Sequence, residues 1–241
     1  MRRAAVCISG HLRQFQRGFE LFNKSIIKPN PTWKFDFFIE TWAHQDWRTN
    51  EKFQLTHDIV GRVSDTYKPK ALSIEPEIEW DTSRYMEFVK NPRWVKKGYG
   101  GVRSRGEHIL AMYYKILRAN ELKSKFEEAR DFKYDAVIRH RTDFILTQNL
   151  ILDEHTSDLS SKVYVPLCDQ AARQGGIPIR DMFAVSSSEN MDYYSSLFTH
   201  VDEVVKAGGV FRPEPMLYFY LKNNKNIDVV ELTHPWQILS D

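Results

Sequence analysis

Three basic or titratable side chains and a carboxylate lie within five residues, next to an apolar run. The stretch YDAVIRHRTDFIL, residues 134–146, begins like a buried strand and then presents Arg139, His140, Arg141 and Asp143 before it turns apolar again. Burying unpaired charge is costly. These side chains are therefore expected to lie exposed at the strand end, to pair with each other, or to bind a ligand.

Asp143 is the carboxylate of this stretch that could do chemistry. Beside two arginines it should remain ionised, which suits it to hold a metal ion or a sugar hydroxyl. A structural ion pair with one of the arginines explains the same spacing equally well.

A second candidate ligand site follows the first apolar run. Ser9 and Gly10 with Arg13 offer a glycine turn, free backbone N–H groups at a helix start and a guanidinium one turn later, which would suit a phosphate. The Lys-Ser/Thr pair of a P-loop and the three glycines of a dinucleotide fingerprint are both missing. The alternative is a strand-to-helix turn with a surface arginine.

Two further carboxylates could act as a general base. Asp181 follows the segment QGGIPIR and begins an apolar run, and it could instead be a loop carboxylate paired with Arg180 or Arg173. Glu214 lies between two prolines that would hold its backbone rigidly. A helix N-terminal acid, favoured by the helix dipole, is the alternative interpretation of Glu214.

Aromatic, basic and histidine side chains complete the set of candidates. Trp42 and Trp47 are the tryptophans nearest the proposed site and offer faces on which rings can stack. Arg103 and Arg105 form a second possible anion site at a helix start, or simply a solvated helix end. No zinc-type spacing involves the histidines, so those at this edge are interpreted as polar lining: His11, His44 and His140.

Strand-like apolar runs alternate with helical patterns, which favours an α/β layer fold. The run at residues 4–10 is continuous rather than alternating, as expected of a strand covered on both faces. Further strands are predicted at residues 35–42, 70–76, 134–139, 163–166, 181–187 and 227–232. Because ligands gather at the carboxyl ends of the strands in open α/β sheets, the candidate residues should meet at one edge.

Helices are predicted between these strands. The clearest spans residues 104–130, where apolar residues recur at spacings of three and four, and others are predicted at residues 13–27, 191–198 and 215–222. Residues 77–101, with weak periodicity, are interpreted as a long surface excursion. Without internal repeats or a low-complexity linker, residues 1–241 are predicted to form a single domain with a mostly parallel central sheet flanked by helices.

Composition limits the classes of partner. The 34 basic and 32 acidic side chains give a formal charge of +2, which argues against a nucleic-acid binder yet permits a local pocket for a small anion. No apolar run approaches transmembrane length, and the N-terminus lacks the features of a secretory signal. Cys7 and Cys168 are interpreted as buried thiols in a reducing compartment. A cytoplasmic protein is therefore expected, and its oligomeric state stays open.

Several short blocks together resemble a known family. They are SGHLRQF, FFIETW, YDAVIRHRTDF, RDMFAVSSSENMDYYSSLF and FRPEPMLYFYLK, which spread over nearly the whole chain. This set resembles a group of small virus-encoded and bacterial glycosyltransferases of GT-A type, related to enzymes of capsule and surface-glycan assembly. The resemblance implies a GT-A-like, Rossmann-type sandwich that transfers a sugar from a nucleotide-diphosphate-sugar donor, such as a UDP-sugar, to a glycan acceptor.

The resemblance also implies roles for individual residues. Asp181 or Glu214 would be the catalytic base. Asp143, in the place of the second carboxylate of a GT-A Asp-x-Asp motif, would bind Mn or Mg or a sugar hydroxyl. The donor would be bound by Ser9, Gly10, Arg13, Thr41, Trp42, Arg105, Arg139, Arg141 and Asp143.

One departure from the family pattern bears on the metal. Arg141 stands where the motif has its first Asp, so a guanidinium could itself neutralise the diphosphate. The altered motif also leaves open a non-catalytic nucleotide- or carbohydrate-binding domain on the same scaffold. Phosphoryl or sulfuryl transfer is disfavoured by the missing P-loop lysine.

Overall fold

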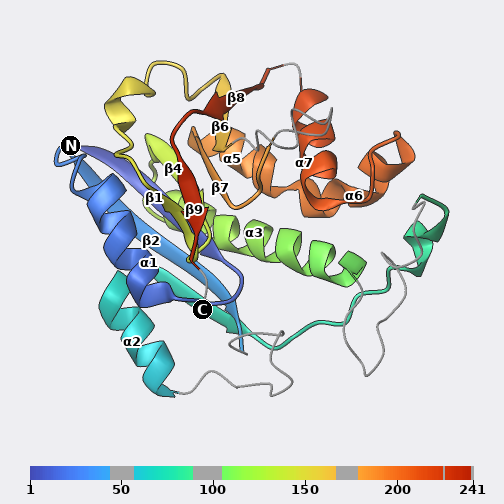
Figure 1. Ribbon diagram of the computed structural model, residues 1–241, viewed down its shortest axis with the longest axis horizontal. Helices are drawn as coiled ribbons and strands as arrows, with labels where there is room; N and C mark the ends of the chain where they lie inside the picture. The colour runs from blue at the N-terminus through green and yellow to red at the C-terminus, as the bar shows by residue number, and fades with distance from the viewer. Residues whose placement is uncertain (44–56, 89–104, 167–178, 225, 240–241) are drawn as a thin grey trace.

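Apolar residues occupy both faces of the first strand. In β1 (Arg2–Ser9), Ala4, Val6 and Ile8 pack into one hydrophobic cluster, and Ala5 and Cys7 pack into another on the opposite side. Because successive side chains of a strand point to opposite faces, this pattern requires helices on both sides of the sheet. The computed structural model describes residues 1–43, 57–88, 105–166, 179–224 and 226–239 (Figure 1).

A seven-stranded sheet carries the described part of the chain, in the order β3-β2-β1-β4-β7-β6-β8. Its other strands are β2 (Trp33–Trp42), β3 (Ala71–Glu75), β4 (Ala136–His140), β6 (Lys162–Pro166), β7 (Phe183–Ser186) and β8 (Asp228–Leu232). Strand β7 pairs antiparallel with both of its neighbours, and the remaining pairs are parallel. The predicted α/β class with a mostly parallel central sheet is confirmed.

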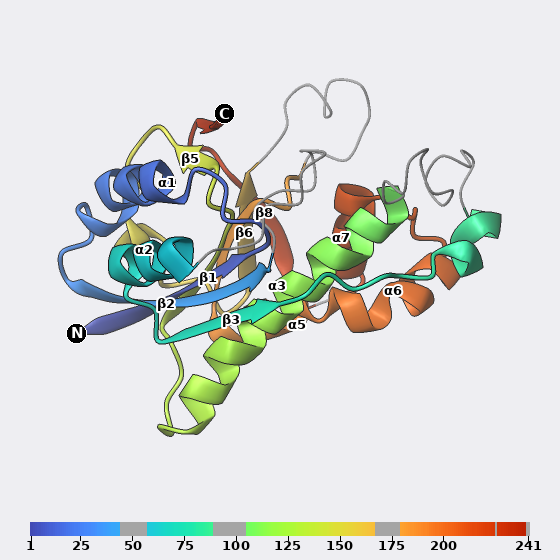
Figure 2. The same ribbon diagram turned by 90° about the horizontal axis from the view of Figure 1, so that it is seen from below.

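Helices cover both faces of the sheet (Figures 1 and 2). On one face lie α1 (Phe15–Phe22), continued by a π-helical segment (Asn23–Ile27), and α2 (His57–Tyr67). The other face is covered by α3 (Arg105–Glu128), α5 (Ser188–Ser195), α6 (Leu197–Lys206) and α7 (Pro213–Lys222). The sheet draws its strands from residue 2 to residue 232.

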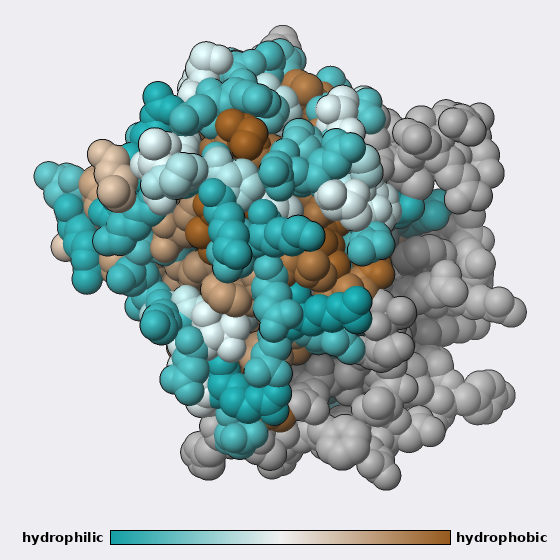
Figure 3. All heavy atoms as spheres, turned by 60° about the vertical axis from the view of Figure 1, so that its left-hand side comes forward, coloured by the Kyte–Doolittle hydropathy of each residue, from teal (hydrophilic) through white to brown (hydrophobic). Residues whose placement is uncertain are grey.

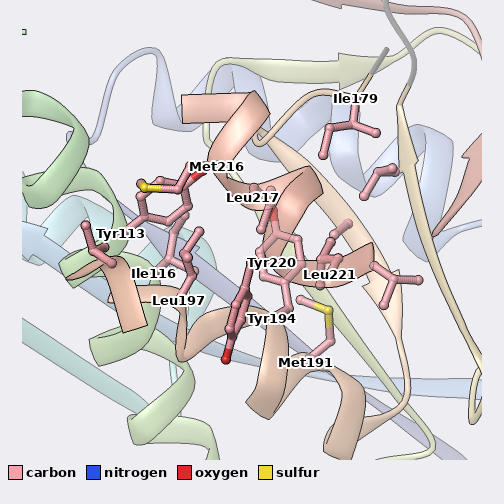
Figure 4. Packing of buried hydrophobic residues seen from close by; sticks show 14 of the residues in the cluster. Tyr113, Ile116, Ile179, Met191, Tyr194, Leu197, Met216, Leu217, Tyr220 and Leu221 are labelled. Atoms are coloured by element: carbon pink, nitrogen blue, oxygen red, sulfur yellow. The ribbon is translucent and has the colours of Figure 1, made fainter. Parts of the chain in front are cut away.

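The larger core cluster joins helices that are far apart in the sequence. Tyr113 and Ile116 of α3 meet Leu197 of α6 and Met216 of α7, all of them buried (Figure 4). The Tyr113 hydroxyl donates a hydrogen bond to the Pro213 carbonyl at 2.8 Å, which fixes the start of α7 against α3. The first turn of α7, with Glu214, is thereby held beside the sheet.

Several elements differ from the sequence prediction. The helix predicted at residues 191–198 is the end of α5 and the start of α6, and α2 was not predicted at all. Two three-residue strands, β5 (Phe144–Leu146) and β9 (Trp236–Ile238), form a separate antiparallel pair. Short 3-10 segments occupy Ser83–Phe88 and Leu152–Glu154. Strands this short carry too few residues for an alternating pattern to be recognised.

The surface over α1 and α2 is covered mostly by hydrophilic residues, with apolar residues visible between them (Figure 3). Within the described ranges, no helix combines the length and the apolar character needed to span a membrane.

Candidate anion-binding site at the strand ends

The order of the strands creates a crevice at one edge of the sheet. From β1 the chain adds β2 and then β3 on one side, and β4 returns to the other side of β1. Helices attached to β1 and β4 therefore lie on opposite faces, and the carboxyl ends of these two strands flank the point where the winding reverses. Ser9 ends β1 and His140 ends β4, so the segments 10–13 and 141–143 leave the sheet side by side.

A cavity of about 380 Å³ lies at this point. Six of the residues predicted to bind a donor line it: Ser9, Gly10, Arg13, Trp42, Arg139 and Arg141. The remaining wall comes from His11, Glu77, His108, Ile109, Ala111, Met112 and Pro213. The sequence thus predicted the lining residues at the ends of β1, β2 and β4, but not Glu77 or the α3 residues His108, Ile109, Ala111 and Met112.

Arg139 is the most informative residue of the cavity. It is 2% exposed, and its Nε and Nη1 atoms have no hydrogen-bond partner among the described residues. Burial lowers the pKa of its guanidinium, yet an arginine does not give up its proton in a protein. A buried cation with unsatisfied donors in the wall of a cavity is expected to meet an anion there.

Two more guanidinium groups share the carboxylate of Asp143. Arg141 donates through Nε to Oδ1 at 2.5 Å and through Nη2 to Oδ2 at 3.1 Å, and Nη1 of Arg13 lies 3.7 Å from Oδ2. The Asp143 side chain is almost fully buried and does not line the cavity. Its place is behind the arginines, where it holds both of them at the cavity wall.

A divalent cation does not fit this arrangement of Asp143. Both carboxylate oxygens face guanidinium groups, and a cation there would lie beside two positive charges. Across the described ranges, no group of three or more His, Cys, Asp or Glu side chains could hold a metal ion. Binding of Mn or Mg through Asp143 therefore gains no support from the geometry.

Two glycines shape the backbone around the cavity. Gly10 has a φ of +98°, a conformation that side-chain-bearing residues rarely adopt. Its N–H donates to the Glu40 carbonyl at 3.1 Å, and α1 begins only at Phe15, so the Gly10 N–H is not one of the free N–H groups predicted at a helix start. Gly18 lies against the segment of Arg141 and Asp143, because a Cβ there would come within 2.0 Å of the Thr142 carbonyl oxygen.

Trp42 forms a wall of the cavity, whereas its neighbour Thr41 does not. Thr41 is fully buried, and its hydroxyl donates to the Trp42 carbonyl at 3.4 Å. Behind Trp42 lies Lys115, a fully buried residue of α3 whose Nζ is 3.9 Å from the centroid of the Trp42 ring. Lys115 was missed by the sequence analysis, although it sits three residues after Met112 within the apolar stripe of the helix.

The two candidate bases lie beside the cavity and do not line it. Asp181 precedes β7, and the next residue, Met182, accepts the Arg141 N–H at 3.1 Å. Burial raises the pKa of the Asp181 carboxyl, and the charge of Glu214 raises it further, against the opposing effect of Arg139 and Arg141. Glu214 lies in the first turn of α7 and is ion-paired with Arg180 at 3.1 Å, so this arginine pairs with Glu214 instead of Asp181.

The other sequence candidates divide into three groups. His140 is buried between Phe22 and Phe183, where burial and two arginines lower its pKa to about 3, so it is a neutral core residue and not polar lining. Arg105 begins α3, and its side chain is not described. Residues outside the described ranges are Trp47, His44, Arg103, Arg173 and Cys168.

Comparison with known proteins gave no assignment: no family model matches this sequence, and a search of curated proteins found no significant match.

Proposed function

We propose that the protein is a glycosyltransferase of GT-A type that takes a sugar from a nucleotide-diphosphate-sugar donor and passes it to a glycan acceptor. The observation that carries the proposal is Arg139, a buried guanidinium with unsatisfied donors in the wall of the cavity at the reversal of strand order. An anion with several oxygens satisfies such a group, and a diphosphate is the anion that nucleotide sugars provide.

The lining of the cavity suggests how the donor lies. The diphosphate is placed against Arg13, Arg139 and Arg141, at the ends of β1 and β4. In the strand order, β2 lies beyond β1 on the side away from β4, and its last residue, Trp42, lines the cavity, so the nucleoside is placed against the Trp42 ring. The apolar side chains of α3 in the wall suit the uncharged part of such a ligand.

Guanidinium groups take the role that a metal ion has in enzymes with two motif aspartates. As the bond between the sugar and the diphosphate breaks, negative charge grows on the leaving phosphate. Fixed positive groups that are already in place stabilise this charge without reorganisation. Asp143 contributes by holding Arg141 and Arg13 in position.

A base must take the proton of the acceptor hydroxyl as the new bond forms. Asp181 and Glu214 both lie on the side of the cavity where Pro213 forms the wall. The raised pKa of Asp181 moves it towards neutral pH, where a general base is most efficient. Glu214 is the more exposed of the two and ion-paired with Arg180. Both therefore remain candidates.

The proposal is tested by ligand-dependent stabilisation followed by turnover. Thermal unfolding is measured with UDP-, GDP- and CDP-sugars, each with and without Mn, because a ligand at a hundredfold excess over its Kd stabilises the fold by about 2.7 kcal/mol. Release of the nucleotide is then assayed for Asp181→Asn and Glu214→Gln. Loss of the base should lower turnover by about a hundredfold or more, with donor affinity unchanged.

A non-catalytic nucleotide-binding domain is the second candidate. It is favoured by Arg141 in place of a motif carboxylate and by the ion pair that occupies Asp143. In that case a nucleotide sugar stabilises the protein but is neither transferred nor hydrolysed. If no nucleotide or nucleotide sugar stabilises the protein, both candidates are rejected.

A further inference from the structure

We propose that Lys115 is a positioning residue that sets the affinity of the cavity for the nucleoside by holding Trp42 in place. The inference rests on the proposed function, in which the nucleoside lies against Trp42. No motif at the strand ends includes Lys115, which comes from the middle of α3.

Lys115 joins the carboxyl ends of two strands. Its Nζ donates to Oε1 of Glu40 on β2, to the Thr41 carbonyl at 3.0 Å, and to Oε2 of Glu75 on β3 at 2.9 Å. An ammonium group has three N–H donors, so these partners use all of them. The register places Glu75 directly opposite Trp42, so the lysine ties down the last pair of residues of β2 and β3.

The same ammonium group supports the Trp42 ring directly. A cation 3.9 Å from the ring centroid is attracted by the electrons of the ring face, and a site without water strengthens this attraction. Tyr114 stacks on Trp42 with ring centroids 6.2 Å apart and an angle of 23° between the planes. Removing the ammonium group frees the ring to leave the position in which it forms the cavity wall.

Lys123 provides the comparison within the same helix. It too is fully buried, and it is ion-paired with Glu127 and Asp192, but neither it nor its partners line the cavity. A lysine whose only role is to hold the fold together should behave like Lys123. A positioning lysine should in addition change how the cavity discriminates between ligands.

The experiment compares two probes by isothermal titration at a temperature where all variants are folded. Inorganic pyrophosphate contacts only the arginines, whereas UDP, GDP and CDP add a nucleoside. Lys115→Met should weaken the best-binding nucleoside diphosphate about tenfold, the loss expected when one base–aromatic contact is weakened, and change pyrophosphate by less than about twofold. Lys123→Met should change neither Kd. If Lys115→Met does not fold because Glu40 is left unpaired, Lys115→Met with Glu40→Gln replaces it.

A double-mutant cycle establishes whether Lys115 acts through Trp42. In the Trp42→Ala background, Lys115→Met should cause no further loss of nucleoside diphosphate affinity. Equal losses for both probes, the same selective loss in Lys123→Met, or full additivity with Trp42→Ala would each overturn the inference. A wild-type protein that binds neither probe would overturn the proposed function, and this inference with it.

Discussion

Arg139 and Lys123 are both buried cations, and the structure treats them in opposite ways. Lys123 donates to Ser188 and Asp192 at 2.7 Å and to Glu127 at 3.2 Å, so its three donors are used within the protein. Arg139 faces a cavity, and two of its nitrogen atoms have no partner in the described part of the chain. A saturated buried cation holds elements together, whereas an unsaturated one next to a cavity is available to a ligand.

His140, the next residue along β4, shows why this difference is informative. Its ring nitrogens are also buried without a partner. A histidine can meet this situation by staying neutral, and burial together with two nearby arginines lowers the pKa of His140 to about 3. Arg139 cannot become neutral in this way, because its guanidinium remains protonated at every pH at which the protein is folded. An unsatisfied arginine is therefore stronger evidence for an anionic ligand than an unsatisfied histidine.

The largest effect is expected at Lys123. Lys123→Met leaves Glu127 and Asp192 without their buried partner, so the free energy of unfolding should fall by about 3–5 kcal/mol, measured by urea denaturation. Lys133→Met is the matched control, because Lys133 also pairs with Glu127 but is half exposed, and it should cost less than about 1 kcal/mol. Equal effects of the two substitutions would contradict a structural role for Lys123.

Gly18 allows α1 to approach the segment that carries Arg141 and Asp143. Because a Cβ would meet the Thr142 carbonyl oxygen at 2.0 Å, Gly18→Ala should cost about 1–3 kcal/mol of unfolding free energy through overpacking. Gly61→Ala, in the open surface of α2, should instead stabilise the protein by about 0.4–1 kcal/mol. If thermal unfolding ranks the two variants the other way, α1 does not pack against this segment as described.

A pH-dependent effect is expected from the titration of His140. Its pKa in the folded protein, about 3, lies below the value of 6.5 expected after unfolding, so the unfolded chain binds the proton between these pH values. The stability that this group contributes is complete above pH 6.5 and is lost as the pH falls below it. When the pH is lowered from 7.5 to 5.5, the unfolding free energy of the wild type should fall by about 1.4 kcal/mol more than that of His140→Phe. An unchanged pH profile would mean that His140 is accessible to protons in the folded state.

The sequence was sufficient to predict a mostly parallel sheet and the meeting of its strand ends at one edge. Continuous apolar runs identified the buried strands, and the rule for strand ends brought Ser9, Arg13, Trp42 and Arg139 to one cavity, where the structure places them. Chain order alone could not show that Thr41 points into the protein while Trp42 forms the wall. The outcome depends on the face of β2 to which each side chain points, and a shift of one residue along the strand reverses that face.

Interactions between distant elements were the part that the sequence did not reveal. Asp143 was known to lie near arginines, but its pairing with Arg13 depends on how the segment 10–13 folds back. Lys115 and Lys123 were hidden in an amphipathic pattern, where a lysine is normally assigned to the solvent side. Both lysines could have been recognised as buried from their positions in the apolar stripe of the helix. A lysine at such a position needs buried partners for its charge.

The central claim, that Arg139 is reserved for a ligand, is tested most directly by two measurements on Arg139→Met: ligand binding and stability. Titration of UDP, GDP and CDP in the presence of EDTA should show binding to the wild type, weakened in the variant by about 1.5–3 kcal/mol, the contribution of a charged hydrogen bond. Urea denaturation should show that the unliganded variant loses far less stability than Lys123→Met, since no internal hydrogen-bond partner of the Nε and Nη1 donors is lost. A variant that binds these nucleotides like the wild type, or that loses as much stability as Lys123→Met, would contradict the account.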